Sequence, residues 1–567
     1  MPPTAPTISD IEDLYQQGKR ERGDLHAQIQ RYRQLRFRKH EVPVPEAYRK
    51  TTKVMRSSIP FISAQSTVSI LSLNPFTIHC VRTGPGDAAQ RTAEKKERVL
   101  EEIFLQAMRE AGRNIYKMCI DAALCDGEAW PKWVYKPDHW TNINQAGKKG
   151  IRDDETAEGF TERMQGMKRL AILPFAWRDA DPTTVYPFED EHGLAMVLEV
   201  TKHARYLMEQ KVDTERGWKQ FQGMGPGRNT QDSSSGNQDV EMRQLWTRHF
   251  VSYQIGDQYK AIPHRYRRVP YFPHGGYTTS SRKPDEQNLS ILFPMLDLAA
   301  GFDSFLTIRQ NLAYMMGFPK FAVKVRSTGD PASAQRTAEL MRQWMAGDVL
   351  SLGADEEIDI IVPQDAPGLD TMIKLAGDQL MLAAPDQVLY GKVQQGSSGV
   401  QLHLQITQAR LTLDPIGSNA EESLTQQAIH IQKMIEKVLR ESVVVSANVS
   451  KDRKRFENKW LELGPDDIKG FYQCQVSITQ VMPPTRISDG EFGAMLLDRG
   501  VISPREYLEA YCYYNQPQQV LDDALLARIE ASPPVQAQLA EDMMRAAGML
   551  PAALPPPAQP PVSQNGG

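Results

Sequence analysis

The chain has 567 residues and a mass of 63.9 kDa, a length that at about 150 residues per domain predicts three or four domains. Its 66 Lys and Arg residues nearly balance its 70 Asp and Glu residues, for a net charge of −4, and 41% of the chain is hydrophobic. This composition excludes disorder of the whole chain and a protein that coats DNA through a strongly basic surface. Because no run of about 18 apolar residues is free of charges and the N-terminus lacks a basic segment before an apolar one, we expect neither a membrane span nor a secretory signal.

Five cysteines are spread over the chain without the C-x-x-C spacing of a zinc or redox site. A chain of this length needs no disulfide framework. We therefore expect reduced thiols, in a cytosolic setting, that pack as small apolar side chains. They are Cys80, Cys119, Cys125, Cys474 and Cys512.

The N-terminal region combines a segment predicted to be disordered with a basic helix. Residues 1–9 are rich in Pro and Thr, and residues 11–40 have a helical pattern of apolar side chains. Between residues 19 and 56, twelve Lys or Arg residues stand against four Asp or Glu residues. We expect this basic stretch to be solvated or to pair with an acidic neighbouring subunit, and contact with nucleic acid is the alternative.

The next part of the chain, to residue 287, alternates between helical and strand patterns. A long helical repeat ends at Gly127, and Gly256-Asp257 has the composition of a hairpin turn. In chain order we expect a helix and a strand within 65–82, a helix over 86–126, a strand over 129–136, a polar insertion over 141–166, a strand–turn–strand over 174–187, a strand over 194–202, a disordered segment over 222–239 and a hairpin over 242–261.

The middle of the chain predicts two long helices around a small α/β unit. Ser290 and Pro294 have the residue types of a helix start, and Pro319 ends that helix. Pro415 should kink a later helix, because proline removes a backbone donor and clashes with the preceding turn. The expected elements are a helix over 290–317, a strand over 321–326, a helix over 333–346, strands over 348–352 and 357–362, a helix over 369–389, a polar loop over 391–399 and a long helix over 400–439.

The C-terminal part begins with strands and continues as helices. Apolar residues alternate at 472–479, and Ser503-Pro504 has the pattern of a helix start. The expected elements are strands at 443–445 and 472–479, helices over 489–499, 503–511, 518–531 and 534–547, and a disordered tail rich in Pro, Ala, Gln and Gly over 551–567.

No motif of an enzyme stands out. The chain has no GxxxxGK[S/T] phosphate loop, no HExxH and no GxSxG, and its eleven histidines are scattered. Paired carboxylates and a lysine at 465–469 faintly resemble a magnesium-binding nuclease motif, but Gly464-Pro465 fits a turn before a helix better. We therefore expect no enzyme activity, no catalytic or metal-binding residue and no cofactor.

The two long helices at 290–317 and 369–389 have more apolar surface than the small unit between them can cover. Packing side by side with copies from other chains would bury the remainder. A head-to-tail contact of this kind closes into a ring when the rotation between copies closes.

In this order of elements the chain resembles the portal proteins of tailed bacteriophages and related prophages. The resemblance extends from residue 10 to residue 547 and rests on short motifs in a fixed order rather than on one signature. In the wing the motifs are IDAALCDGEAW (120–130) and RDADPTTVYP (178–187). Around the stem and the step into the clip they are RVPYFP (268–273), LSILFPMLDL (289–298) and MGFPK (316–320). At the tunnel loop and kinked helix they are YG (390–391) and SSGVQL (397–402), and in the helical crown DGEF (489–492) through VISPREY (501–507).

The resemblance implies an α+β, mostly helical, ring-forming subunit with portal-like regions. It implies a closed homo-dodecamer at one capsid vertex of the virion, assembled in the host cytoplasm, through which a terminase packages double-stranded DNA and from which DNA is ejected. Capsid and adaptor or tail proteins would be further partners, with no membrane and no cofactor. Carried over by position, the regions are a disordered N-terminus (1–9), wing (10–287), stem helix (288–317), clip (318–362), returning stem helix (363–390), tunnel loop (391–400), kinked long helix and wing return (401–480), crown (481–547) and disordered tail (548–567).

A DNA conduit must let DNA slide, and many Lys or Arg contacts to phosphates would bind DNA tightly through counterion release. A near-neutral chain with a mostly polar loop offers weak contacts that ignore sequence. We expect three loop side chains to approach the DNA and two glycines to let the loop change shape, with a plain solvent loop as the alternative. The approaching residues are Lys392, Gln394 and Gln395, the glycines are Gly396 and Gly399, and Ser397 and Ser398 complete the candidate DNA-channel residues.

Two other functions stay open at this point. One is another structural virion or head–tail adaptor protein, although adaptors are usually much shorter. The other is a DNA-processing enzyme, against which the missing phosphate loop and metal motif count.

Overall fold

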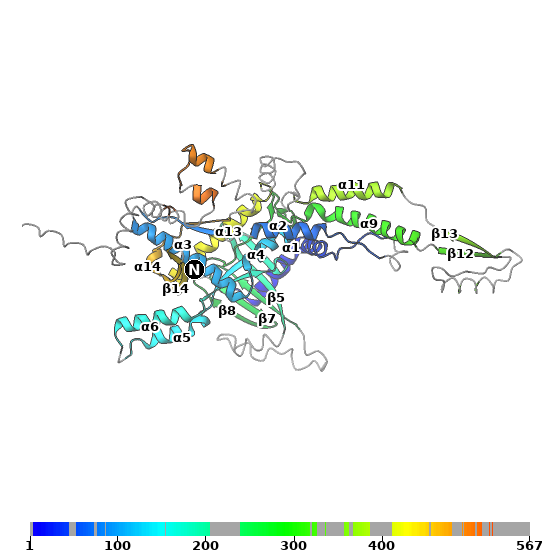
Figure 1. The fold of residues 1–567 in the computed structure, drawn as a ribbon. Coiled ribbons are helices and arrows are strands. Elements are labelled where there is room, and N and C mark those ends of the chain that lie inside the picture. The colour runs from blue at the N-terminus through cyan, green and yellow to red at the C-terminus, as the bar shows by residue number, and fades with distance from the viewer. Residues whose placement is uncertain are drawn as a thin grey trace, which may run out of the picture. The chain divides into compact units, whose positions relative to one another are not determined.

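Two antiparallel sheets and the helices packed on them form most of the first of two units into which the chain divides (Figure 1). The first unit comprises Met1–Val449 and Asn458–Gln480, and the second comprises Ser450–Glu457 and Val481–Gly567. The described part of the chain is α+β with more helix than strand, as the sequence predicts. The computed structural model describes residues 4–44, 53–72, 76–84, 87–152, 155–204, 239–317, 320–325, 356–361, 367–385, 411–452, 455–478, 493–504 and 507–512, with isolated positions at 335, 339, 490, 521 and 524.

A five-stranded antiparallel sheet packs on both faces, because successive side chains of a strand point to opposite sides. Leu198 forms a buried cluster with Ile11 of α1 (Ile8–Arg36), whereas its neighbour Val197 forms one with Trp130 of the second sheet. The sheet therefore lies between α1 and the second sheet. In order of pairing its strands are β4 (Val185–Asp190), β5 (Gly193–Ala204), β6 (Asp239–Trp246), β7 (Phe250–Ile255) and β8 (Gln258–Pro263).

The second sheet is built around β2 (Glu128–Tyr135), which pairs with β3 (Phe175–Ala180) and β9 (His274–Gly275). Trp133 and Trp177 stack with ring centroids 5.5 Å apart. Phe104 of α3 (Asp87–Ala111) meets both rings edge-on, at 5.0 Å. Trp133 Nε1 also donates a hydrogen bond of 2.9 Å to Gln427 Oε1, which ties α13 (Asp414–Lys433) to this aromatic core.

The first helix starts earlier than predicted. α1 begins at Ile8, three residues before the expected start, because Thr7 and Asp10 cap it reciprocally. The Asp10 backbone N–H donates to Thr7 Oγ1 at 3.2 Å, and the Thr7 backbone N–H donates to Asp10 Oδ2 at 2.7 Å. This capping box satisfies two otherwise unpaired donors and makes residues 8 and 9 helical, although they fall in the segment predicted to be disordered.

The single helix predicted over 86–126 is two helices, α3 and α4 (Ile115–Asp126). Gly112 between them has a φ of +64°, a left-handed conformation that ends a helix. The Asn114 side chain then accepts a hydrogen bond of 2.9 Å from the Lys117 backbone N–H and starts α4. The apolar repeat continues through the break, so periodicity alone could not show it.

Two further predictions are wrong in detail. The polar insertion over 141–166 holds two helices, α5 (Thr141–Lys149) and α6 (Ala157–Leu170). Ile143 is buried in α5, and the Thr156 side chain caps α6 by accepting a hydrogen bond of 3.1 Å from the Gly159 backbone N–H. The hairpin over 242–261 is the three-strand run β6–β7–β8, since a second turn separates Trp246 from Phe250. Its predicted turn at Gly256 is confirmed, with a φ of +55°. The residues 222–238 predicted to be disordered lie outside the described part.

Segments distant in the sequence meet where β1 (Thr77–Cys80) pairs with β16 (Cys474–Ser477). Cys80 and Cys474 are direct partners in this ladder, and both are buried free thiols. The remaining cysteines are also free, with Cys512 the least buried of them. The prediction of unpaired, mostly buried thiols is therefore confirmed.

The remaining predictions for the C-terminal part are tested only in part. The strand predicted at 443–445 is longer and pairs as a hairpin, and helical residues lie at 493–498 within the predicted helix over 489–499. The helices predicted over 518–531 and 534–547 and the tail from 548 fall almost wholly outside the described residues.

The elements not yet given complete the fold. They are α2 (Ile59–Ser72), η2 (Pro137–Trp140), η3 (Pro182–Thr184), β10 (Tyr277–Thr278), α8 (Pro284–Gln287), β11 (Asn288–Leu289), β14 (Val443–Asp452), β15 (Arg455–Leu463), α14 (Pro465–Ile468) and, in the second unit, η8 (Tyr507–Tyr511).

Candidate functional site

Two helices continue directly into a two-stranded ladder. α9 (Leu296–Gly317) leads into β12 (Lys320–Val325), and β13 (Glu356–Ile361) leads into α11 (Pro367–Ala383). β12 and β13 pair antiparallel, from Lys320 opposite Ile361 to Val325 opposite Glu356. These strands confirm the predictions at 321–326 and 357–362, whereas the helix and strand predicted between them fall outside the described residues apart from isolated positions.

The helix pair α9–α11 lies side by side and antiparallel (Figure 1). Arg309 Nε of α9 and Asp370 Oδ1 of α11 form an ion pair at 3.0 Å. One to two turns away on each helix, the Phe302 ring packs against Gly377, where a Cβ would come within 3.3 Å of it. The close approach explains why a residue without a side chain stands at that position of α11.

The helix pair leaves large apolar side chains in solvent. On α11, Met372, Leu375 and Leu382 are 54%, 59% and 79% exposed, and their spacing places them on one face, called here the α11 stripe. On α9, Ile308 and Met316 are 47% and 41% exposed. Single exposed apolar residues are ordinary, whereas several on one helix pair form a candidate contact surface.

The base of α9 is held by a buried carboxylate. Asp303 is fully buried, and its oxygens accept hydrogen bonds from the Ser57 backbone N–H at 2.8 Å and contact His40 Nε2 at 2.9 Å. One turn further, Thr307 Oγ1 accepts from the Met55 backbone N–H at 3.0 Å. These contacts hold the segment after α1 against α9.

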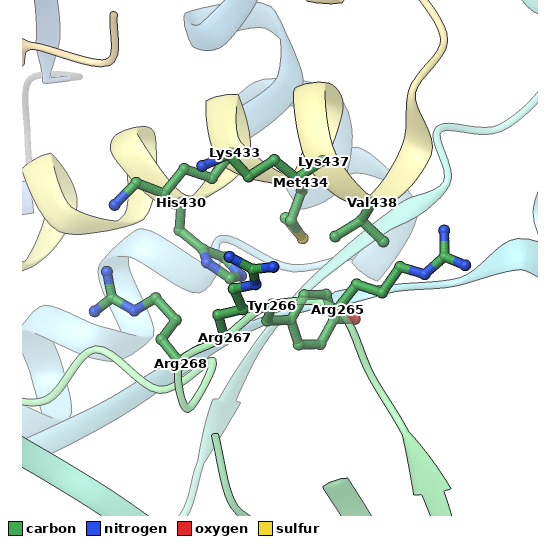
Figure 2. Close-up of a pocket in the computed structure, with 9 residues that line it drawn as sticks. All are labelled: Arg265, Tyr266, Arg267, Arg268, His430, Lys433, Met434, Lys437 and Val438. Carbon is green, nitrogen blue, oxygen red and sulfur yellow. The ribbon is translucent and has the colours of Figure 1, made fainter. Parts of the chain in front are cut away.

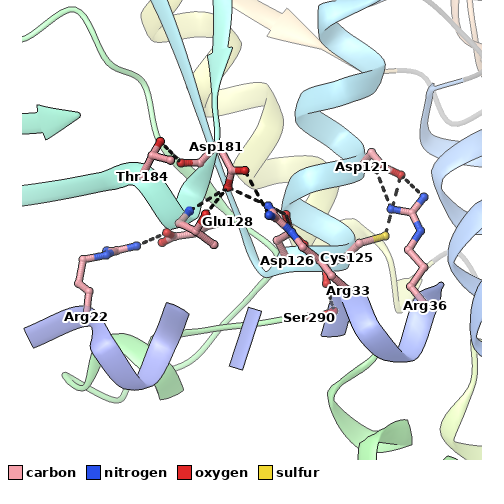
Figure 3. A network of polar contacts seen from close by, with 11 residues as sticks. Arg22, Arg33, Arg36, Asp121, Cys125, Asp126, Glu128, Asp181, Thr184 and Ser290 are labelled. Carbon is pink, nitrogen blue, oxygen red and sulfur yellow. Dashed lines mark hydrogen bonds and ion pairs between the residues drawn. The ribbon is translucent and has the colours of Figure 1, made fainter. Parts of the chain in front are cut away.

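Arginines of α1 form ion pairs with carboxylates of the same chain (Figure 3). Arg33 is the most connected: its Nη2 lies 2.7 Å from Asp126 Oδ2 and 2.9 Å from Asp181 Oδ1. Burial raises the pKa of Asp126, against the effect of Arg33. Burial also acts to raise the pKa of Asp181, but hydrogen bonds from Arg33 and the Thr183 backbone outweigh it and hold that pKa below its usual value.

Two other arginines of α1 follow the same pattern, Arg36 one turn after Arg33 and Arg22 about three turns before it. Arg36 makes a two-pronged ion pair with Asp121, at 2.7 and 2.8 Å, and Arg22 pairs with buried Glu128. The predicted solvated or intersubunit role of the basic stretch is therefore wrong for these arginines, because folding brings carboxylates of α4 and β2 and that of Asp181, just before η3, onto that face. Sequence reasoning missed these pairs, since no local pattern indicates a partner so far along the chain.

Ser290 does not cap the long helix, contrary to prediction. Its Oγ donates to the carbonyl oxygens of Leu124 and Cys125, at 3.0 and 2.7 Å, and accepts from the Leu292 backbone N–H at 3.0 Å. A short 3-10 turn, η5 (Phe293–Met295), then precedes α9. Ser290 thus joins the end of α4 to the start of the α9 segment.

The predicted DNA-channel residues and the predicted kink stay predictions. The whole loop 391–400 lies outside the described residues, which leaves Lys392, Gln394, Gln395, Gly396, Ser397, Ser398 and Gly399 unplaced. Pro415 lies in the first turn of α13, after Leu413 as its cap residue. Proline is well suited to that position, because its missing N–H would have no helical partner there. Residues 401–410, on the other side of the predicted kink, are not described.

The carboxylates at 465–469 have structural partners. Asp467 accepts a hydrogen bond of 2.9 Å from the Gly464 backbone N–H at the start of α14, and Lys95 Nζ lies 2.9 Å from it. The interpretation as a turn before a short helix is confirmed. Within the described ranges, no cluster of three or more His, Cys, Asp or Glu side chains could hold a metal ion, and no helix is long and apolar enough to cross a membrane.

Comparison with known proteins finds a likeness to solved structures but none to family models or curated proteins. Neither protein-family models nor curated proteins match the sequence. A solved structure described as "Neck of empty GTA particle computed with C6 symmetry" aligns over 83% of this chain and 94% of its own, with 12% identity and a TM-score of 0.40. A likeness this loose shows no family membership.

Proposed function

We propose that the chain is a portal-type subunit that forms a ring-shaped channel at one vertex of a phage-like capsid. In this proposal the ring is a closed homo-oligomer, a dodecamer as the sequence resemblance implies, through which double-stranded DNA is packaged and ejected. Terminase, capsid and adaptor or tail proteins dock on it. The observation that supports this function best is the antiparallel helix pair α9–α11, which leads into a strand ladder and keeps the α11 stripe exposed.

Contact with a second copy explains the exposed apolar side chains. Burying a whole leucine side chain is worth about 1.5–3 kcal/mol, so covering the exposed parts of Leu375 and Leu382 would contribute roughly 1–2 kcal/mol each. Ile308 and Met316 give α9 an apolar surface of its own. When α11 of one copy packs on α9 of the next, every copy uses both surfaces, and the head-to-tail contact closes into a ring.

Images of the purified full-length protein test this proposal. We expect rings with a central hole in negative stain. The double variant Leu375→Glu with Leu382→Glu should abolish the rings. Two carboxylates would have to be buried between neighbouring subunits without water or a partner, which is energetically unfavourable. Lys374→Glu adds a carboxylate at an exposed position of α11 outside the stripe and should leave the rings intact. A wild-type monomer would contradict the proposal, and a monomer with nuclease or ATPase activity would favour the DNA-processing enzyme.

The tunnel-loop hypothesis needs a separate experiment. In the proposed channel, Lys392, Gln394 and Gln395 contact passing DNA weakly, and Gly396 and Gly399 allow the loop to change shape. Bulky replacements at Gln394, Gln395 and Ser397 should reduce the amount of DNA packaged while the rings still form. A normal packaging yield would contradict a gating role of the loop.

A further inference from the structure

A pocket of about 140 Å³ lies between residues 265–268 and the end of α13 (Figure 2). This volume is about ten times the least that one water molecule needs. Three cations come from the loop after β8 and two from α13 and the π-helical turn η7 (Met434–Leu439) that continues it. They are Arg265, Arg267, Arg268, Lys433 and Lys437.

No carboxylate lines this pocket, although Glu436 bonds Tyr472, the ring over which Lys433 and Lys437 rest. None of its lining residues is acidic, and among the described residues none of the five cations forms an ion pair. Burial lowers the pKa of Lys433, and repulsion by Arg268 and Lys437 lowers it further. Burial also lowers the pKa of Arg268. Cations gathered in one hollow with no carboxylate raise each other's energy, which a bound anion would relieve.

His430 lines the pocket as a buried imidazole. Its side chain is 1% exposed, and neither ring nitrogen makes a hydrogen bond of ordinary geometry in the described part. The ring is held between Tyr266 and Phe272, at centroid distances of 5.5 and 5.1 Å. Burial and the nearby Arg268 and Lys433 hold its pKa well below the usual value, although a weak hydrogen-bonding contact with the Trp133 backbone raises it. A neutral imidazole has a single N–H, so His430 adds polarity to the pocket wall without adding charge.

The backbone around the pocket is unusual on both sides. Arg267 has a φ of +56°, a region that few residues other than glycine adopt. On the opposite side the chain leaves α13 through a π-helical turn, and Arg440 after it has a φ of +59°. Strained residues and π-helical turns both cluster at ligand-binding sites.

We propose that this pocket binds a phosphate group, supplied either as inorganic phosphate or as a phosphodiester of a DNA backbone. The guanidinium group of Arg267 offers forked N–H donors that match phosphate oxygens. Arg268, which also reaches Gln426 at 3.5 Å, and the lysines add charge, and His430 forms part of the wall. Lys433 and Lys437 now rest over the Tyr472 ring, with Nζ 5.3 and 5.4 Å from its centroid, and their long side chains can swing to an anion. The proposal depends only on the first unit and not on ring formation.

Titration of the full-length protein tests the site. We expect sodium phosphate to bind where sodium chloride of equal ionic strength does not, as measured by calorimetry. Replacing both lysines, Lys433→Gln with Lys437→Gln, should weaken phosphate binding at least about tenfold, a change of about 1.4 kcal/mol. Lys148→Gln with Lys149→Gln removes the same charge from the exposed end of α5 and should change nothing. Arg267→Gln, at an exposed side chain, should weaken binding independently of the lysines.

A labelled DNA duplex distinguishes the two sources of phosphate. If the pocket takes one backbone phosphate, the lysine variant should reduce the slope of log affinity against log salt by up to about one. Phosphate binding with an unaltered DNA slope supports the site for free phosphate alone. The proposal would be overturned if the protein did not bind phosphate. It would also be overturned if the α5 control variant lost as much phosphate affinity as the variant of the two pocket lysines. Ring images of the same preparations report separately on the proposed function.

Discussion

Replacing Arg33 by methionine should destabilise the first unit in a way that depends on pH. Methionine keeps much of the length of the side chain but removes the guanidinium that contacts Asp126 and Asp181. Asp126 is 8% exposed and would be left as a buried carboxylate without a cation. The cost comes from that carboxylate more than from the lost pair itself.

The size of the effect follows from burial. Breaking a buried ion pair by removing one partner costs about 3–5 kcal/mol. Arg33 keeps 28% of its side chain exposed and Asp181 keeps 45%, so water screens part of the interaction. We therefore expect Arg33→Met to lower the free energy of unfolding by about 2–4 kcal/mol at pH 8. Arg33→Lys keeps the charge but loses the fork and should cost about half as much.

The pH dependence has a defined sign. Burial already raises the pKa of Asp126, and removing Arg33 raises it further, above the value in the unfolded chain. A carboxyl whose pKa is raised by folding binds a proton more readily in the folded state, so its penalty is full at high pH and shrinks as the pH falls through the folded pKa. The loss caused by Arg33→Met should therefore be smaller at pH 5 than at pH 8.

Urea unfolding followed by tryptophan fluorescence measures this loss, because Trp130, Trp133, Trp177 and Trp246 are all buried in the first unit. Wild type and variants must be compared at one protein concentration, since association would stabilise the fold by mass action. Asp126→Asn combined with Arg33→Met should recover part of the stability at pH 8. A loss below about 1 kcal/mol at pH 8, or an equal loss at both pH values, would refute the reasoning.

Two further changes test the core by the same measurement. Gly127→Ala should lower the free energy of unfolding more than Gly112→Ala. Both glycines have a left-handed φ, which costs a residue with a side chain about 1–2 kcal/mol. Only at Gly127 would the new Cβ also lie 2.7 Å from a backbone oxygen, that of Asn288. Equal losses would show that the chain relaxes around Gly127. His274 is fully enclosed, and burial lowers its pKa to about 4, so the unfolded chain binds the extra proton and stability should rise by up to about 3 kcal/mol between pH 4 and pH 6.5. His274→Gln should flatten that part of the profile, and an unchanged profile would mean that other groups produce it.

Much of the secondary structure could be predicted because its signals are local. The strand–turn–strand around Asp181, the turn at Gly256 and the two strands that α9 and α11 flank all follow from side-chain alternation and turn residues within a few positions. The predictions were wrong where two local patterns indicated different structures. Gly112 and Asn114 break a continuous apolar repeat, and α5 and α6 form within a stretch whose polar composition resembles a loop.

The candidate sites were predicted less well, for a different reason. The excess of apolar surface on the two long helices was visible in the sequence, and Met372, Leu375 and Leu382 confirm that part of it stays exposed within the chain. The proposed phosphate pocket could not be predicted from the sequence. His430 and Arg268 are far apart in the chain, and only the packing of α13 beside the loop after β8 brings them together.

The sequence by itself determined the α+β class, many of the strands and turns and the near-neutral charge, because periodicity, turn chemistry and composition are properties of neighbouring residues. Only the tertiary structure decided what the basic first helix does. Arg33 meets Asp126 and Asp181, which lie 93 and 148 residues further along the chain. Helical spacing in a sequence shows which face of a helix is charged. It does not show which residues contact that face, because the packing of the whole unit determines them.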